Sequence, residues 1–427
     1  MMIVTILLFF VLLHCRYQRL GDKTMNNKSK YYMAASALMA ASIATAAPVA
    51  STKPVVAGSI LGRVQAFLDK PATWDKIPKN VTLCMFAPGG IQGKTFQYVR
   101  NNMSELTKYT AIAKDIGIDF NVTMSSPTTM RIDLASSKLK RKVSTDVKFN
   151  IYNDERVASE DFKVGQCDGI AMSNIRARQY NHFVGSLDAI GAVLSYKQLG
   201  EVLNILAKPE MNKYMVSQNY EIVGVIPMGA AYIMVNDRKI NTISKAAGKK
   251  VAVFDFDKSQ AKMVQNIGAQ PVSVDFSNVG GKFNNGQVEI MAAPALAFEP
   301  LELYRGMTDA QGNARGAIIK FPLLQVTGVL MMYQNKFPEG LGPLIREFIA
   351  GQLAPAYQFV LETENEIPSK YWMDLPEADK PGYVAMMRTA RIQMTKEGHY
   401  DKQMMRLLKN VRCKLEPSNF ECAMNDE

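Results

Sequence analysis

The chain has 427 residues, of which 48% are hydrophobic and 21% are charged. These proportions exclude a disordered chain, and the length exceeds that of one ordinary core, which predicts two globular units with appendages. The net charge is +11, but the Lys and Arg residues are scattered, with one dense cluster at Lys138–Lys142. Because this cluster has no interleaved aromatic residues, we expect a solvated loop or helix end and no nucleic-acid partner.

The first 46 residues predict an export signal and therefore a periplasmic protein. From Met25, two lysines precede an apolar stretch and the small-x-small ending 44–46, a pattern typical of cleavage before Ala47. We expect Met25 to be the true start. The apolar run 2–13 is about half as long as a bilayer span, and a retained anchor is the alternative to cleavage. Cleavage removes five cations and one anion, which lowers the net charge from +11 to +7.

A first α/β unit is predicted after a lead-in at 47–79. The folded body begins at Asn80 with an apolar strand, a glycine-rich turn and a segment with helical spacing of its apolar residues. Alternation of strands and helices predicts a largely parallel sheet covered by helices. The predicted strands are 81–87, 120–125 and 163–173, and the predicted helices are 60–68, 95–117, 177–185 and 198–206.

A second α/β unit follows, and the last quarter of the chain is predicted to be helical. Two strands near Val223 and Met234 are expected to form the crossing between the units. Beyond them the pattern predicts strands at 249–254, 271–276, 287–294 and 316–334, and helices at 258–268, 342–361 and 381–411.

Four cysteines follow the export signal, and an even number in an oxidising compartment predicts disulfides. Three pairings are possible in principle. A local bridge between Cys413 and Cys422 is our first choice, because they lie nine residues apart in a tail with little else to hold it. This pairing leaves Cys84 with Cys167, both in strand-like segments. With two histidines and no CxxC motif in this part of the chain, we expect no metal site and no cofactor.

The segment 87–95, APGGIQGKT, resembles a phosphate-binding loop, but Pro88 stands where such a loop needs a glycine. We therefore predict a glycine-rich turn at the carboxyl end of a strand, which is where open α/β sheets place ligand crevices. Asp255 and Asp257 lie on one face at a strand end, where they form a metal or acid-base pair or cap the following helix. No nucleophile and base can be combined in a catalytic set, so we do not expect an enzyme.

Two arginines, Arg176 and Arg178, follow a predicted strand end. An arginine there is placed to bind a carboxylate with two hydrogen bonds, and the alternative is a surface ion pair. Phe86 and Phe254 end other strands, where they line the same crevice or belong to the core.

From Gly224 onward the chain resembles the solute-binding subunits of tripartite ATP-independent periplasmic (TRAP) transporters of the DctP type. The resemblance rests on four segments at matching spacing, which cover roughly 70 residues. They are Asn236–Asn241, which matches Asn-x-Arg-x-Ile-x, Gly248–Val253, Ile267–Val272, and Asn285–Glu289 followed by Pro294.

The resemblance also shows where this chain departs from the family. Ala252 stands at the position of the arginine that clasps the ligand carboxylate in the family, Tyr232 matches a second arginine, and Ala293 matches a ligand-contacting asparagine. The resemblance thus implies two lobes that close on a small molecule. The three replacements predict a pocket for an apolar or aromatic compound, unless Arg176 supplies the missing charge for an organic acid from the other lobe. The candidate ligand-binding residues are Phe86, Arg176, Tyr232, Ala252, Asp255 and Ala293.

We therefore predict an α/β protein with the two-lobe periplasmic binding protein fold, of type II-like topology, and a helical C-terminal portion. Lobe I is expected to comprise 80–230 plus 318–335, lobe II 231–317, and the helices of 336–427 are expected to pack on both. The expected function is capture of a solute for a membrane transporter by a monomeric protein. An exported envelope scaffold that keeps the fold without a small ligand is the alternative.

Overall fold

The computed structural model describes residues 60–104 and 110–427. The predicted export signal and its cleavage position lie outside these residues. The described chain forms one mixed sheet flanked by helices, so the predicted α/β class is confirmed. Its strands are β1 (Asn80–Phe86), β2 (Ile118–Ser126), β3 (Thr129–Ser136), β4 (Arg141–Tyr152), β5 (Gly169–Ser173), β6 (Val216–Ser217), β7 (Tyr220–Val235), β8 (Lys250–Phe254), β9 (Gln270–Val274), β10 (Ile290–Pro294), β11 (Ala317–Tyr333) and β12 (Trp372–Met373).

The helices cover both faces of this sheet. The predicted lead-in helix at 60–68 has the predicted bounds, whereas each long C-terminal prediction is divided into two helices. The helices are α2 (Ile60–Leu68), α3 (Pro71–Asp75), α4 (Lys94–Ser104), α5 (Thr110–Asp115), α6 (Glu155–Lys163), α7 (Asn174–Ala177), α8 (His182–Gly185), α9 (Tyr196–Leu206), α10 (Asn212–Met215), α11 (Ile243–Ala246), α12 (Lys258–Asn266), α13 (Val279–Asn284), α14 (Tyr304–Met307), α15 (Leu341–Ala350), α16 (Leu353–Glu366), α17 (Lys380–Lys396) and α18 (Lys402–Leu415).

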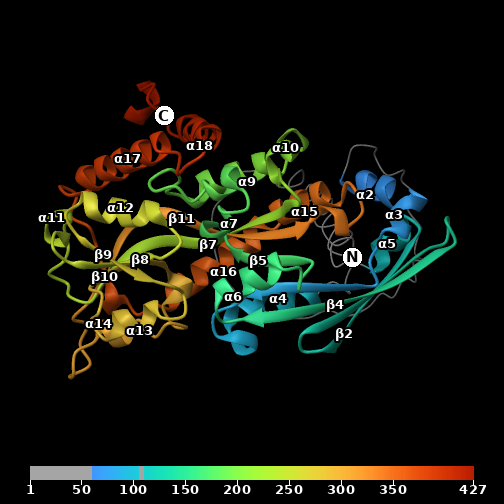
Figure 1. The fold of residues 1–427 in the computed structure, drawn as a ribbon, viewed down its shortest axis with the longest axis horizontal. Coiled ribbons are helices and arrows are strands. Elements are labelled where there is room, and N and C mark those ends of the chain that lie inside the picture. Colours follow the sequence, from blue (N-terminus) through green and yellow to red (C-terminus); the bar gives the residue numbers. More distant parts are fainter. Residues whose placement is uncertain (1–59, 105–109) are drawn as a thin grey trace, which may run out of the picture.

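Two long antiparallel strands, β7 and β11, join the two halves of the sheet. The strand order is β2-β3-β4-β1-β5-β11-β7-β10-β8-β9. We call β2, β3, β4, β1 and β5 the first half and β10, β8 and β9 the second half; Figure 1 shows them at opposite ends with β7 and β11 between them. The prediction of separate strands near Val223 and Met234 was wrong, because β7 continues through both. Pro227 and Gly229, which has φ of 109°, bend the strand and do not end it.

The first half is built around β1, which pairs in parallel with β4 and β5. Its side chains are buried on both faces, which explains the continuous apolar run in the sequence. Strands β3 and β4, which the sequence analysis did not predict, form a hairpin whose turn carries the basic cluster 138–142. Lys138 pairs with Asp69 at 2.7 Å and Arg141 with Asp75 at 2.6 Å, so the cluster makes exposed ion pairs with residues of the lead-in segment.

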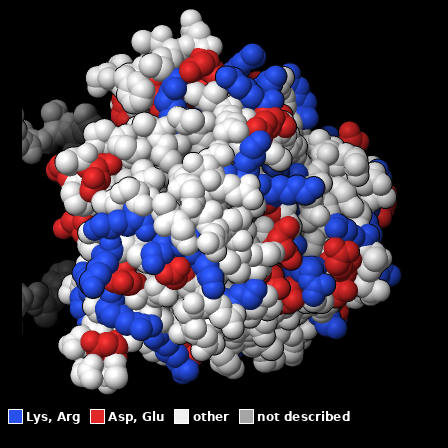
Figure 2. Space-filling view, turned by 60° about the vertical axis from the view of Figure 1, so that its left-hand side comes forward, with Lys and Arg blue, Asp and Glu red and all other residues white. Residues whose placement is uncertain are grey.

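Charges on the second half are likewise paired locally. Figure 2 shows this side of the molecule, where Lys and Arg side chains form a band with Asp and Glu side chains beside it. Lys249 contacts Glu289 at 2.8 Å, and Arg305 contacts Glu302 at 2.9 Å. On this face the band of Lys and Arg side chains therefore has acidic side chains next to it, and large uncharged areas lie around it.

Both expected disulfides are present. Cys84 is bonded to Cys167 with a Cα–Cα distance of 5.7 Å, and Cys413 to Cys422 with 5.6 Å. Cys84 lies in β1, whereas Cys167 lies just before β5 and not within a strand. Because β1 and β5 are neighbours, the first bond ties β1 to the segment that leads into β5.

The C-terminal helices contact both halves of the sheet. The side chain of Asn266 on α12 donates to Gln393 of α17 at 2.9 Å, and Gln198 on α9 donates to Glu416 after α18 at 2.9 Å. Figure 1 shows α17 beside α12 and α18 beside α9. These helices therefore bridge the molecule from one half to the other.

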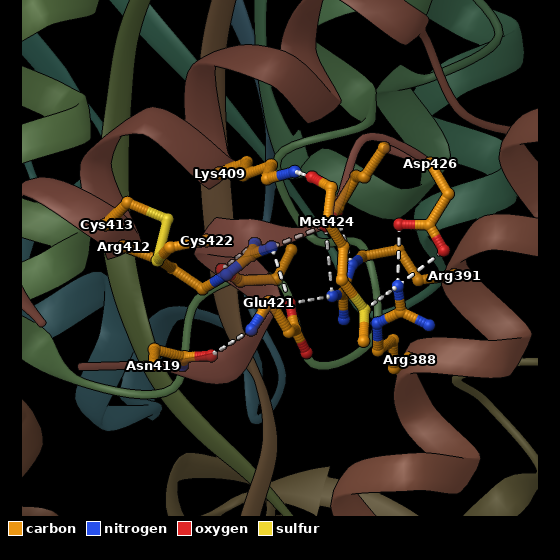
Figure 3. Close-up of polar contacts among 12 residues, drawn as sticks. Arg388, Arg391, Lys409, Arg412, Cys413, Asn419, Glu421, Cys422, Met424 and Asp426 are labelled. Carbon is orange, nitrogen blue, oxygen red and sulfur yellow. Dashed lines mark hydrogen bonds and ion pairs between the residues drawn. A yellow bond between two sulfur atoms is a disulfide. The ribbon is translucent and has the colours of Figure 1, made fainter. Parts of the chain in front are cut away.

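A buried ionic cluster fixes the C-terminal tail to α17 and α18. Figure 3 shows Arg391 and Arg412 converging on Glu421, at 2.6 and 2.9 Å. Arg412 also contacts the Glu427 carboxylate at 2.6 Å. Arg391, which is 1% exposed, donates to the carbonyl oxygen of Ile190 at 3.1 Å. Arg391 thus connects the C-terminal tail to the loop that contains Ile190.

Candidate functional site

A cavity of about 950 Å³ lies between the two halves of the sheet. Its wall is formed by the carboxyl ends of β1, β4 and β5, the middle of β7 and β11, the strands of the second half, and α16. Parallel strands of α/β proteins present their carboxyl ends to ligands, and this position matches that rule. The volume is within the range of small-molecule sites, roughly 300–1,000 Å³.

The wall of this cavity is almost entirely apolar. Among the described residues that line it there is no lysine, arginine or histidine, and the one acidic side chain is Asp154. That carboxylate caps α6, because it accepts the backbone N–H groups of Arg156 at 2.8 Å and Val157 at 3.3 Å. The wall therefore holds no side-chain cation for a ligand carboxylate.

A row of aromatic rings crosses the cavity from the first half to the second. The ring of Phe86, at the end of β1, lies 5.1 Å from that of Phe276, which follows β9. Phe276 lies 4.3 Å from Phe254, and Phe254 is stacked on Phe256 at 5.4 Å. Phe276 was not among the predicted residues, although its place two residues after the end of β9 corresponds to that of Phe256 after β8. Phe86 and Phe254 were selected because they end predicted strands, and the same criterion applied to β9 would have selected Phe276.

The structure brings together three of the six candidate ligand residues. Phe86, Ala252 and Ala293 line the cavity. Tyr232 does not, because its hydroxyl donates to Glu364 at 3.2 Å and its ring packs against that of Trp372. Burial raises the pKa of this Tyr232 hydroxyl, and the nearby Glu364 carboxylate raises it further.

The other two candidates also lie off the cavity wall. Asp255 is exposed in the turn that follows β8. Arg176 is 6% exposed, and its Nε donates to the Glu155 carboxylate at 2.9 Å. Burial raises the pKa of Glu155, although the Ser173 N–H and the Arg176 charge act in the opposite direction. Arg176 therefore has an internal carboxylate partner, which the sequence did not reveal.

The two predicted arginines instead meet the loop after β8, across the boundary between the halves. The guanidinium of Arg176 lies 3.9 Å from the centre of the Phe256 ring. Arg178 contacts the Asp257 carboxylate at 3.4 Å, and both side chains are largely buried. We call these four residues, Arg176, Arg178, Phe256 and Asp257, the clasp. Asp257 also caps α12 through the Ser259 N–H, which agrees with the capping alternative.

The glycine-rich segment 87–95 forms a turn and not a phosphate loop. Gly90–Gln92 is one turn of 3₁₀ helix, and Gly89, with φ of 81°, adopts a backbone conformation that favours glycine. Lys94 begins α4 and forms an ion pair with Glu366 of α16. The lysine of the GKT pattern therefore has a structural partner in the described chain.

One buried polar group beside the cavity had no sequence signal. The Asp188 carboxylate accepts the Thr327 N–H at 3.0 Å, the Thr327 hydroxyl at 2.5 Å and the Asn174 amide at 3.1 Å. Thr327 lines the cavity. Burial raises the pKa of Asp188 to about 6, because the hydrogen bonds offset only part of the desolvation.

Comparison with known proteins assigns the family. The family model described as solute-binding protein AdeT 1/2 matches residues 37–427. The chain belongs to this family. It is 49% identical over 282 residues to the probable solute-binding protein AdeT1 of Acinetobacter baumannii, a match that covers 66% of this chain and 91% of the relative. It is 29% identical over 243 residues to the probable solute-binding protein AdeT2 of the same organism, covering 57% of this chain and all of the relative.

Solved structures confirm the two-lobe fold of this AdeT 1/2 family member. A TRAP periplasmic solute-binding protein from Rhodoferax ferrireducens with bound malonate has a TM-score of 0.57 at 15% identity, covering 80% of this chain and all of that protein. One from Desulfovibrio salexigens with bound orotic acid has a TM-score of 0.56 at 13% identity, covering 79% and 100%. At such identities the likeness establishes the fold alone. Within residues 60–104 and 110–427, no helix combines the length and apolar character needed to span a bilayer.

Proposed function

We propose that this protein works outside the cytoplasm as a non-catalytic receptor that captures a small molecule between its lobes and presents it to a membrane transporter. The observation that carries the proposal is the cavity, because its wall combines strand ends from the first half with strands from the second. Membership in a solute-binding family supports the same function, and the secretion pattern of the first 46 residues supports a periplasmic location.

The proposed lobes are 80–230 plus 318–335 for lobe I and 231–317 for lobe II, with 336–427 on both. A ligand that contacts both lobes favours the closed state by its difference in affinity for the two states. The clasp joins the same two lobes at the edge of the cavity, through Arg178 and Asp257. In this proposal, ligand contacts and the clasp act together, and the transporter recognises the closed form.

Phe86, Ala252 and Ala293 are the proposed ligand contacts among the residues singled out in the sequence. Ala252 and Ala293 are small, so their strands leave room beside the aromatic row that begins at Phe86. Replacing Phe86 by Ala removes an aromatic face from the wall, which we expect to weaken binding by about tenfold. Phe420, which is 52% exposed in the C-terminal tail, provides the matched Phe→Ala control.

Small-angle X-ray scattering of the mature protein against a broad metabolite library tests the proposal, together with native mass spectrometry of freshly purified protein. We expect at least one compound to reduce the radius of gyration, and a retained ligand to appear as added mass. No compaction and no added mass with any compound would favour the envelope scaffold.

A further inference from the structure

The cavity continues into the interior of lobe II as an apolar arm. Six of the side chains that line this arm are Val235, Ile240, Ile243, Val251, Val264 and Ile267. They come from β7, β8, α11, α12 and the segments beside them. Val235 and Ile240 belong to one small hydrophobic cluster and Val264 to another, and Val251 and Ile267 pack against both. The cavity is lined by residues of both clusters.

The opposite end of the cavity, in lobe I, is apolar as well. It is lined by Leu83 and Met85 of β1, Val99 and Met103 of α4, and Phe149 of β4. Uncharged polar side chains are spread along the wall, and they include Thr95, Tyr98, Asn102, Asn153, Ser173, Thr242, Gln260, Ser277 and Gln352. An occupant that fills this space therefore meets mostly apolar side chains and a few neutral hydrogen-bonding groups.

A ligand carboxylate would be poorly stabilised in this cavity. Burying an anion costs free energy unless a cation or several hydrogen-bond donors accompany it. The two arginines that the sequence analysis considered as carboxylate ligands already have internal partners. Arg176 pairs with Glu155, and Arg178 pairs with Asp257. Moving Arg176 to a ligand would leave the fully buried Glu155 carboxylate without its cation.

We propose that the ligand is an uncharged, elongated, largely apolar molecule: a hydrocarbon chain or linked rings with a neutral hydroxyl, ester or amide group. This proposal rests on the proposed function, because it names the class of solute that the same cavity takes. The proposed ligand class differs from malonate and orotic acid, the organic acids that are bound to two structural neighbours.

Displacement of a fluorescent probe tests the ligand class on the delipidated mature protein. N-phenyl-1-naphthylamine, which is uncharged and apolar, serves as the probe. Its competitors are 1-dodecanol, dodecanoate and succinate, of which the first two share a chain length and differ in charge. We expect 1-dodecanol to displace the probe at a concentration at least about tenfold lower than dodecanoate, and succinate to displace none.

A matched pair of variants locates the probe in the lobe II arm. Ala246 lines the cavity and is 8% exposed, whereas its neighbour Ala247 is exposed and lies off the wall. Ala246→Phe fills the arm, and we expect it to raise the dissociation constant of the probe by about tenfold or more. Ala247→Phe is expected to keep the dissociation constant of the probe within about twofold of the wild-type value. Circular dichroism checks that both variants fold.

The outcomes separate this inference from the proposed function. Probe displacement by 1-dodecanol, with compaction in scattering, supports both. Compaction with succinate or dodecanoate, but not with 1-dodecanol, overturns the apolar ligand class and leaves the capture function standing. Equal effects of the two Phe variants overturn the arm as the binding site. Absence of any binding or compaction overturns both proposals.

Discussion

Loss of the charge on Asp257 is expected to open the clasp while leaving helix α12 intact. The Asp257→Asn variant keeps a side-chain oxygen that accepts the Ser259 N–H, and asparagine caps helices about as well as aspartate. It removes the negative charge that faces Arg178 at 3.4 Å. The exposed Asp255, two residues earlier, provides a matched control, since Asp255→Asn changes the net charge by the same amount.

The size of the effect follows from the geometry of this ion pair. At 3.4 Å and an effective dielectric constant of about 20, the attraction between two unit charges is about 5 kcal/mol. Desolvation offsets most of it, since the two side chains are only 14% and 7% exposed, so we expect a net contribution of about 1–2 kcal/mol. A change of that size shifts the ratio of closed to open molecules by a factor of about 5–30.

Small-angle scattering of the ligand-free protein measures this shift as a larger radius of gyration in Asp257→Asn. Probe titration is expected to show weaker binding by up to the same factor, because part of the binding free energy is then used to close the lobes. Asp255→Asn should match the wild type in both measurements. An unchanged radius and affinity in Asp257→Asn would refute the view that the clasp holds the lobes together.

Three further predictions concern stability. Arg391→Met should lower the free energy of unfolding in urea by about 3–5 kcal/mol, because it leaves two buried carboxylates, Glu421 and Glu427, with Arg412 as their one remaining cation. Arg388→Met, at the more exposed pair with the tail, should cost under about 1 kcal/mol. Replacing both Cys413 and Cys422 by Ser should lower it by about 2–3 kcal/mol, or selectively free the tail for proteolysis. Burial raises the pKa of the Asp188 carboxyl to about 6 in the folded protein. The protonated carboxyl therefore stabilises the folded state at pH values below the pKa that Asp188 has in the unfolded chain, and this stabilisation is lost as the pH rises through 6. The unfolding free energy relative to Asp188→Asn should therefore fall by up to about 3 kcal/mol between pH 4 and 7, and a flat difference would contradict the assignment.

The elements of the fold were predictable where the periodicity of the sequence was strong. The apolar run of β1 and the helical spacing of α2 each corresponded to a single element with no break. The β3–β4 hairpin was missed, because Thr129–Ser136 and Arg141–Tyr152 alternate apolar residues with charged ones and are less hydrophobic than the neighbouring strands. The bend at Pro227 resembled a break between strands, since proline removes a donor that a central strand normally uses.

The sequence predicted where some residues of the candidate site lie, but it did not predict which side chains they interact with. Phe86 and Ala252 lie where the strand ends and the family spacing placed them. The environment of Arg176 was not predictable, because its partner Glu155 lies 21 residues earlier, at the start of another helix. Only the parallel pairing of β4, β1 and β5 brings the two side chains together. Sequence spacing gives the ends of single strands, and tertiary structure decides which ends are neighbours.

Two buried arginines of this protein lie off the cavity wall and are paired with internal carboxylates. Arg176 is neutralised by Glu155, and Arg346, which is 4% exposed, by Glu221 at 2.9 Å. Each of these arginines contributes to the scaffold and not to the ligand wall, so the field of one charge is cancelled within a few ångströms. Because the described residues of the wall include no cation, we expect the wall to select a ligand by shape and by neutral hydrogen bonds, since an anion would enter without compensation. Introducing one cation at Ala252, which lines the cavity and matches an arginine position of the TRAP family by the sequence resemblance, is therefore expected to turn the preference toward carboxylates.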